Sequence, residues 1–146
     1  MTGYRIGWLM TKNRPFLNAC LRLQSQQFTC ATMVAQKAAE AALTGPQTCV
    51  DQMREVFEQR RDLICRLAAD IPGWKFNKPQ GAFYLFPDVS ALGDGDAVAE
   101  MLLEKAHVAV VSGSAFGTPS CIRLSYAIST EEIEEAMQRI KQALKS

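Results

Sequence analysis

Apolar residues recur every three or four positions in several stretches of the chain, which is the spacing of an α-helix. The longest such stripe, over residues 49–70, ends at Pro72-Gly73, and the outer face of this predicted helix is charged. Shorter helices are predicted over residues 15–24 and 31–43, and the second of these stops at Gly45-Pro46. The stripe of the long helix consists of Val50, Met53, Phe57, Ile64, Leu67 and Ile71.

The second half of the chain alternates between strand and helix signals. Apolar and β-branched runs predict strands at residues 81–89, 107–113 and 121–127. A helix is predicted over residues 94–106, and Ser129 with Glu132 forms a capping box for a last helix. A further strand is predicted within residues 1–11. This order predicts an α/β fold, and within it an α+β small domain, in which a long connecting helix packs with a small sheet covered by helices.

Composition and charge narrow the functional classes. The 146 residues are 48% hydrophobic and carry a net charge of +1, so neither a nucleic-acid surface nor a basic membrane anchor is expected. No stretch reaches the roughly 20 apolar residues that span a bilayer, and the first residues lack a signal-peptide pattern. Five scattered cysteines and one histidine argue against a disulfide framework and a metal site. We expect a reduced, cytoplasmic setting.

Arg123 stands out in the predicted strand CIRLSYA because alternate strand residues face opposite sides. Ile122, Leu124 and Tyr126 would share one face, and Arg123 would lie on the other face among small neighbours that leave it a recess. Two interpretations stay open. Arg123 is either a protective charge on a solvent-facing edge strand, or part of a pocket wall that binds a carboxylate or phosphate through the planar fork of guanidinium donors.

Arg5 has a comparable setting, since it lies between Gly3 and Gly7 in the run GYRIG. Glycines let a ligand or another backbone approach closely, which suits an anion contact, and a purely structural arginine is the alternative. The run SGSAFG, residues 112–117, is a turn of small residues after a predicted buried strand. It either borders a site through its backbone N–H groups or is a plain connection.

The other reactive side chains give no catalytic signal. Phe83 and Tyr84 are expected in the core, and His107 is expected to be structural. The lysines lie in polar surroundings, which are not those of a nucleophile. The residues alone therefore predict an α/β unit with two candidate anion-binding arginines and without a catalytic base or nucleophile.

Four strings in order, MTGYRIGW, GAFYLFPD, VVSGSAFG and IRLSYA, resemble the carboxy-terminal part of the class I/II aminotransferases. These are pyridoxal-phosphate enzymes of the aspartate aminotransferase type, fold type I. The segment LQSQQFTCATMVAQKAAEAAL also resembles that family's segment near the subunit interface. The resemblance covers essentially the whole chain. It implies that residues 1–45 are a residual segment of the large pyridoxal-phosphate-binding domain with interface helices, and that residues 46–146 are the long connecting helix and the C-terminal small domain.

The resemblance also implies roles for the two arginines. Arg5 is similar to the arginine that pairs with the cofactor phosphate, and Arg123 to the one that holds the substrate α-carboxylate in a bidentate fork. In this family the lysine that forms the Schiff base lies just upstream of the matching Met-Thr-Gly, and it is absent from these 146 residues. We therefore assign no catalytic residue to the chain. We expect it to be inactive by itself and not to bind pyridoxal 5′-phosphate.

The implied full-length parent is a cytoplasmic homodimer that transfers an amino group between an amino acid and a 2-oxo acid. Neither nucleic acid nor membrane is expected as a partner. Two alternatives stay open: a free-standing carboxylate-binding or interaction module, and a pyridoxal-phosphate lyase or synthase of the same fold. Apolar residues such as Ile6, Trp8 and Phe28 would lack their partners in the isolated chain, so we expect it to self-associate.

Overall fold

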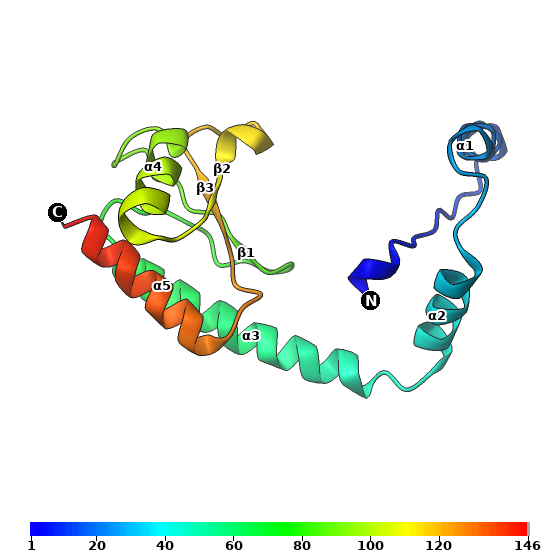
Figure 1. Ribbon diagram of the computed structural model, residues 1–146, viewed down its shortest axis with the longest axis horizontal. Helices are drawn as coiled ribbons and strands as arrows, with labels where there is room; N and C mark the ends of the chain where they lie inside the picture. Colours follow the sequence, from blue (N-terminus) through cyan, green and yellow to red (C-terminus); the bar gives the residue numbers. More distant parts are fainter. Residues whose placement is uncertain (146) are drawn as a thin grey trace. The chain divides into compact units, whose positions relative to one another are not determined.

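The computed structural model describes residues 1–145, and it divides into two compact units (Figure 1). The first unit comprises Met1–Cys49, and the second unit begins at Val50. The first unit contains a 3₁₀ turn, η1 (Thr2–Tyr4), followed by helices α1 (Arg14–Gln27) and α2 (Met33–Thr44). The two helices predicted for this part of the chain are therefore confirmed.

Local capping explains where α1 and α2 begin. The Asn13 side chain accepts a hydrogen bond from the backbone N–H of Phe16 at 3.1 Å, and the Thr32 hydroxyl accepts one from Ala35 at 3.3 Å. Each cap satisfies a backbone donor that a helix start leaves unpaired. The strand predicted within residues 1–11 is wrong, because a strand needs a ladder partner and this segment has none among the described residues.

The long helix predicted over residues 49–70 is α3 (Thr48–Ala69). Its second half faces the core through Leu63, Ile64 and Ala68. The apolar stripe predicted for this helix is buried only over its second half, because Val50 and Met53 are 50% and 54% exposed. Figure 1 shows the reason: the first turns of α3 extend beyond the sheet.

The second unit contains a three-stranded antiparallel sheet in the order β1-β3-β2. The strands are β1 (Tyr84–Leu85), β2 (Val111–Ser112) and β3 (Ile122–Ser125). They lie inside the predicted runs but are shorter. Ala82 and His107 have φ values of 58° and 53°, which do not fit a strand, and Pro87 has no N–H for a ladder. His107 therefore ends a helical turn and does not open a buried strand as expected.

One apolar core holds the second unit together. Leu85, Ile122 and Leu124 turn one face of the sheet inward, together with Tyr126. The predicted helix over residues 94–106 is α4 (Gly95–Met101) continued by a π-helical turn, η2 (Leu102–Ala106). The last helix, α5 (Thr130–Ala143), begins with the predicted capping box and buries Ile133, Met137 and Ile140.

This arrangement confirms the predicted fold class, in which a long helix and further helices cover a small sheet. Lys141 of α5 also pairs with Asp70, just after α3, at 3.2 Å. No helix within residues 1–145 is both long and apolar enough to cross a membrane.

Candidate functional site

Arg123 lies on the central strand, β3, directly opposite Val111 of β2. Its sequence neighbours Ile122 and Leu124 are buried, as the predicted alternation requires, so Arg123 points to the other face of the sheet. The edge-strand interpretation is thereby excluded, since β3 is paired on both sides. Arg123 is partly buried and belongs to an open sheet face.

Two aromatic rings flank the Arg123 guanidinium. Its central carbon lies 4.3 Å from the ring centroid of Tyr84 on β1 and 4.5 Å from that of Phe116. Both distances are well within the range of cation–π attraction. The recess around Arg123 is therefore walled by aromatic rings, and the small strand neighbours considered from the sequence do not define it. We refer to Arg123, Tyr84 and Phe116 as the arginine clamp.

The donors of the Arg123 guanidinium meet no acceptor among residues 1–145, which supply it with neither a hydrogen bond nor an ion pair. Two other arginines of the same unit are paired: Arg61 contacts Glu58 and Asp62, and Arg139 contacts Glu135. A guanidinium carries five N–H donors in one plane. The arginine clamp thus holds a fixed positive charge whose donors are free to bind an anion.

Phe116 reaches the clamp from the 3₁₀ turn η3 (Gly113–Phe116), which joins β2 to β3. The Ser112 hydroxyl accepts from the N–H of Ser114 at 3.1 Å, and the Ser114 hydroxyl donates to Asp96 of α4 at 3.0 Å. A side chain at Gly113 would place its Cβ 2.0 Å from the Thr118 carbonyl oxygen, so only glycine fits there. The beginning of the turn is therefore anchored to α4 and to the backbone at Thr118.

The backbone of this turn does not act as the sequence suggested. The Gly113 N–H donates to the Cys121 carbonyl at 2.7 Å, and the Gly117 N–H donates to Ser114 at 3.2 Å. Together with the Ser114 N–H, these donors are used inside the fold. The run SGSAFG does border the arginine clamp, and it does so through the ring of Phe116.

Arg5 belongs to the first unit and does not lie in a strand, contrary to the expected strand context. It ends η1 with φ 48°, a left-handed conformation. The side chain is exposed, and its Nη1 donates to the Thr2 carbonyl at a long 3.4 Å. A Cβ added at Gly3 or Gly7 would meet no atom within 4 Å. The glycines thus leave open space on either side of Arg5, as an anion contact requires.

A row of rings connects the arginine clamp to α3. The Phe83 ring lies 4.6 Å from that of Tyr84 and 5.8 Å from that of Phe57. On the other side, Phe86 meets Phe116 edge-on at 6.0 Å. Phe83 is 38% exposed, and Tyr84 is partly buried, so the expectation that both belong to the core is wrong.

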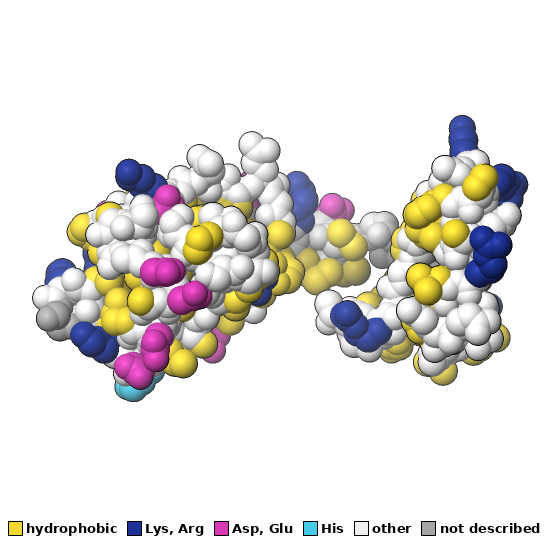
Figure 2. All heavy atoms as spheres, turned by 90° about the horizontal axis from the view of Figure 1, so that it is seen from above, with side chains coloured by type: hydrophobic (Ala, Val, Ile, Leu, Met, Phe, Trp, Pro, Cys, Tyr) yellow, Lys and Arg dark blue, Asp and Glu magenta, His cyan; other side chains and the backbone are white. Residues whose placement is uncertain are grey.

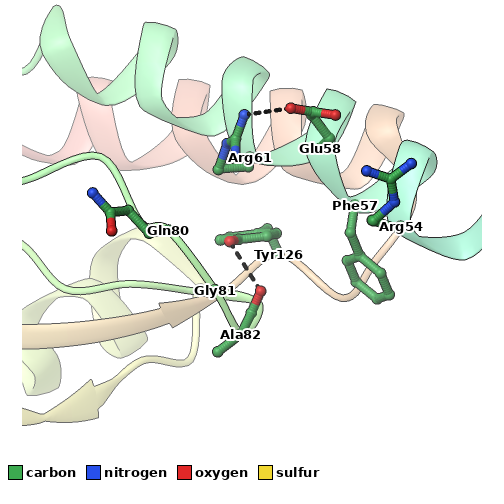
Figure 3. Close-up of a pocket in the computed structure, with 8 residues that line it drawn as sticks. All are labelled: Arg54, Phe57, Glu58, Arg61, Gln80, Gly81, Ala82 and Tyr126. Atoms are coloured by element: carbon green, nitrogen blue, oxygen red, sulfur yellow. Dashed lines mark hydrogen bonds and ion pairs between the residues drawn. The ribbon is translucent and has the colours of Figure 1, made fainter. Parts of the chain in front are cut away.

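The far end of this row opens into a cavity of about 410 Å³ between α3 and the loop before β1 (Figure 3). It is lined by Arg54, Phe57, Glu58, Arg61, Gln80, Gly81, Ala82 and Tyr126. The Tyr126 hydroxyl donates to the Ala82 carbonyl at 3.3 Å, and burial raises the pKa of this phenol. Its proton is therefore held in a structural bond that fixes the loop before β1.

Comparison with known proteins assigns the chain to a family. The model of the family "Aminotransferase class I and II" matches residues 1–140. The chain belongs to the class I and II aminotransferases. The resemblance seen in the four sequence strings is thereby confirmed.

Similar proteins show how much of a full-length aminotransferase the chain covers. The chain is 46% identical to a probable aspartate/prephenate aminotransferase of Aquifex aeolicus, over 99% of this chain and 38% of that protein. It is 42% identical to an aspartate aminotransferase of Bacillus subtilis, over 97% of this chain and 37% of that protein. The chain thus spans less than two fifths of the length of these curated aminotransferases.

Solved structures agree on the fold. An aspartate aminotransferase from Rhizobium meliloti superposes with a TM-score of 0.91 at 37% identity, covering 99% of this chain and 39% of that chain. The aspartate aminotransferase from Thermus thermophilus with maleate gives 0.91 at 37% identity, covering 98% and 38%. This aminotransferase chain therefore shares its fold with part of those enzymes.

Reasoning from sequence missed Tyr84 and Phe116 as site residues of this aminotransferase chain. Strand alternation in GAFYLFPD puts Tyr84 and Phe86 on one strand face, opposite Leu85. This alternation could have indicated that Tyr84 faces away from the core. The proximity of either ring to Arg123 could not be predicted from the sequence, because it depends on which strands pair.

Proposed function

We propose that the chain is the carboxy-terminal portion of a pyridoxal-phosphate-dependent aminotransferase of the aspartate aminotransferase type. The parent transfers an amino group between an amino acid and a 2-oxo acid. Family membership and the names of the relatives support this reaction over a lyase or synthase of the same fold. The observation that carries the proposal is the Arg123 guanidinium, partly buried, flanked by two rings and without an acceptor among the described residues.

Arg123 would bind the α-carboxylate of the substrate. Two parallel N–H groups of a guanidinium match the two oxygens of a carboxylate, and such charge-assisted bonds contribute about 1.5–3 kcal/mol each. Holding the carboxylate fixes one end of the substrate and so orients the bonds of its α-carbon. Arg123 acts here by binding and orientation and moves no proton.

Arg5 would bind the phosphate of the cofactor. Its exposed donors, of which only one makes a long contact within residues 1–145, and the open space beside Gly3 and Gly7 fit an anion of that size. When bound, pyridoxal 5′-phosphate supplies the electron sink for chemistry at the α-carbon. The Schiff-base lysine would come from a part of the parent outside these 146 residues, so this chain by itself would be inactive.

The remaining proposals concern setting and partners. We place the parent in the cytoplasm as a homodimer, with an amino acid and a 2-oxo acid as its ligands. The net charge of +1 over the chain supports neither nucleic acid nor an anionic membrane surface as a partner.

The assignment of Arg123 is tested by Arg123→Gln in the full-length protein. We expect kcat/KM for transamination to fall by about 100-fold or more, since two charge-assisted hydrogen bonds are lost, with unchanged affinity for pyridoxal 5′-phosphate. Arg139→Gln on the exposed face of α5 is the matched control and should leave kcat/KM unchanged. An Arg123→Gln protein with full activity would contradict the proposal.

The assignment of Arg5 is tested by Arg5→Gln in the same protein. We expect the Kd for pyridoxal 5′-phosphate to rise by about tenfold or more, because one charge-assisted contact with the phosphate is removed. Arg22→Gln, an exposed arginine of α1 in the same unit, is the control. Equal Kd values for Arg5→Gln and the unaltered protein would show that Arg5 does not hold the phosphate.

A further inference from the structure

The Arg123 guanidinium is positioned without a single hydrogen bond or ion pair from residues 1–145. An arginine side chain has several rotatable bonds, and ordering it costs about 2 kcal/mol of side-chain entropy. An arginine without polar partners would normally sample many rotamers, so something else must hold this one. Tyr84 and Phe116 are the side chains placed to do so.

The two rings arrive from different directions and are themselves anchored. Tyr84 is fixed by the pairing of β1 with β3, where it lies opposite Ser125, and by its contact with the Phe83 ring. Phe116 is fixed by the anchored turn η3 and by the edge of the Phe86 ring. The guanidinium is thus confined by parts of the fold that do not depend on a ligand.

Aromatic rings attract a guanidinium through their faces and do not accept its N–H groups as a carboxylate would. An acidic residue in either place would also fix the arginine, and it would use the donors that a ligand needs. Rings therefore hold the charge while keeping the donors available. They also exclude water from part of its surface, which strengthens a later ion pair.

We infer that Tyr84 and Phe116 are positioning residues that pre-order Arg123 for a carboxylate ligand, so that ligand affinity depends on both rings through Arg123. This inference rests on the proposed role of Arg123 and adds a specific mechanism to it. The ligand class is an amino acid or 2-oxo acid presenting a carboxylate. Neither ring contacts the ligand in this account, and their effect is absent when Arg123 is absent.

The test uses the full-length protein and the inhibition constant (Ki) of maleate, a carboxylate present in one of the similar crystal structures. Phe116→Leu and Tyr84→Leu keep an apolar side chain and remove the ring. Each is expected to raise the maleate Ki by about 3- to 30-fold, the range of a partly desolvated cation–π contact, with an unchanged Kd for pyridoxal 5′-phosphate. KM for the amino acid should rise by a similar factor with little change in kcat.

Three further variants separate positioning from general structure. Tyr84→Phe keeps the ring and should restore the unaltered Ki, which excludes a role for the hydroxyl. Phe57→Leu removes a ring of the same row that makes no contact with Arg123 in the described structure, and should leave Ki unchanged. Phe116→Leu introduced into Arg123→Ala should cause no further rise beyond that of Arg123→Ala, because the ring acts through the guanidinium.

The outcomes distinguish this inference from the proposed function. If Arg123→Ala raises Ki and the two leucine variants do not, the positioning role is wrong and the binding role of Arg123 stands. If Arg123→Ala leaves Ki unchanged, the proposed role of Arg123 itself is wrong. Phe116 is 47% exposed, so Phe116→Leu is expected to fold. If Tyr84→Leu lowers the melting temperature, the Ki of Phe116→Leu alone decides whether the rings position Arg123.

Discussion

The two units of the chain bury very different amounts of apolar side chain. In the second unit, α3, η2, α5 and one face of the sheet enclose a continuous core. In the first unit, Ala35 is the one buried side chain among residues 1–49. Figure 2 shows hydrophobic side chains at the surface of the part that carries α1 and α2, and Trp8 and Phe28 are 62% and 65% exposed.

The two candidate site arginines therefore have different structural support. The arginine clamp is attached to strands and a turn that the core of the second unit fixes. Arg5 lies in a unit whose helices are held mainly by their own backbone hydrogen bonds and caps. Isolated helices of this length are marginal in water. We therefore expect the second unit to be the stable part of the chain.

The largest expected effect contrasts one core residue with one exposed residue. Ile140→Ala, at a fully buried position of α5, should lower the free energy of unfolding by about 2–5 kcal/mol, because it removes packed methyl groups and leaves a cavity. Leu21→Ala on α1 should change it by less than about 0.5 kcal/mol. Urea denaturation of the chain measures both. Similar losses for the two variants would contradict the comparison.

A second prediction concerns association. The exposed apolar side chains of the first unit should make the isolated chain self-associate. Trp8→Ser combined with Phe28→Ser should raise the dissociation constant by about tenfold or more, since burying each aromatic side chain contributes about 1.5–3 kcal/mol. Leu103→Ser, an exposed site on η2, is the control. Sedimentation showing a stable monomer of the unaltered chain at high concentration would refute this.

Removing one helix cap from each unit should give a smaller difference in stability between the two units. Ser129→Ala breaks the capping box of α5 and should lower the free energy of unfolding of the second unit by about 1 kcal/mol. Thr32→Ala removes the cap of α2 and should leave the unfolding midpoint of the second unit unchanged. Circular dichroism during urea denaturation follows both. An equal shift of the midpoint in the two variants would show that the units unfold together.

The smallest expected effect is a dependence on pH. Asp62 of α3 accepts hydrogen bonds from Arg61 and from Lys78, each at 2.8 Å, and these lower its pKa from 3.8 to about 2. The unfolded state then binds more protons than the folded state in this range. The contribution to stability is therefore present above about pH 4 and is lost as the pH falls toward 2.

Asp62→Asn should flatten the fall in stability between pH 4 and pH 2 and should change stability little at neutral pH, since the pair is solvent-exposed. Glu40→Gln in the exposed pair with Lys37 of α2 is the control in the first unit. Unfolding midpoints measured across this pH range give the slopes. An unaltered slope in Asp62→Asn would argue against the Lys78 and Arg61 contacts.

Local signals made part of this structure predictable. Ser129 and Glu132 predict the start of α5, and Asn13 and Pro15 predict the start of α1. These signals are local because each acts within one helical turn. The alternation around Arg123 correctly predicted that Ile122 and Leu124 face the core. Element type followed from such short-range patterns.

The features that the sequence did not predict depend on contacts between distant segments. The strand lengths follow from left-handed residues such as Ala82 and from strand pairing, neither of which alternation reveals. The arginine clamp requires β3 to lie between β1 and β2, and it requires the turn η3 to return Phe116 over the sheet. No local pattern encodes that meeting of three segments. The resemblance to a family suggested a role for Arg123, and the structure supplied the means of holding it.

The most direct test of the account is a crystal structure of the full-length protein with maleate bound. We predict that both oxygens of one carboxylate lie about 2.7–2.9 Å from two nitrogens of Arg123, with the guanidinium still flanked by Tyr84 and Phe116. A maleate carboxylate bound elsewhere, with the Arg123 side chain turned into solvent, would contradict the central claim.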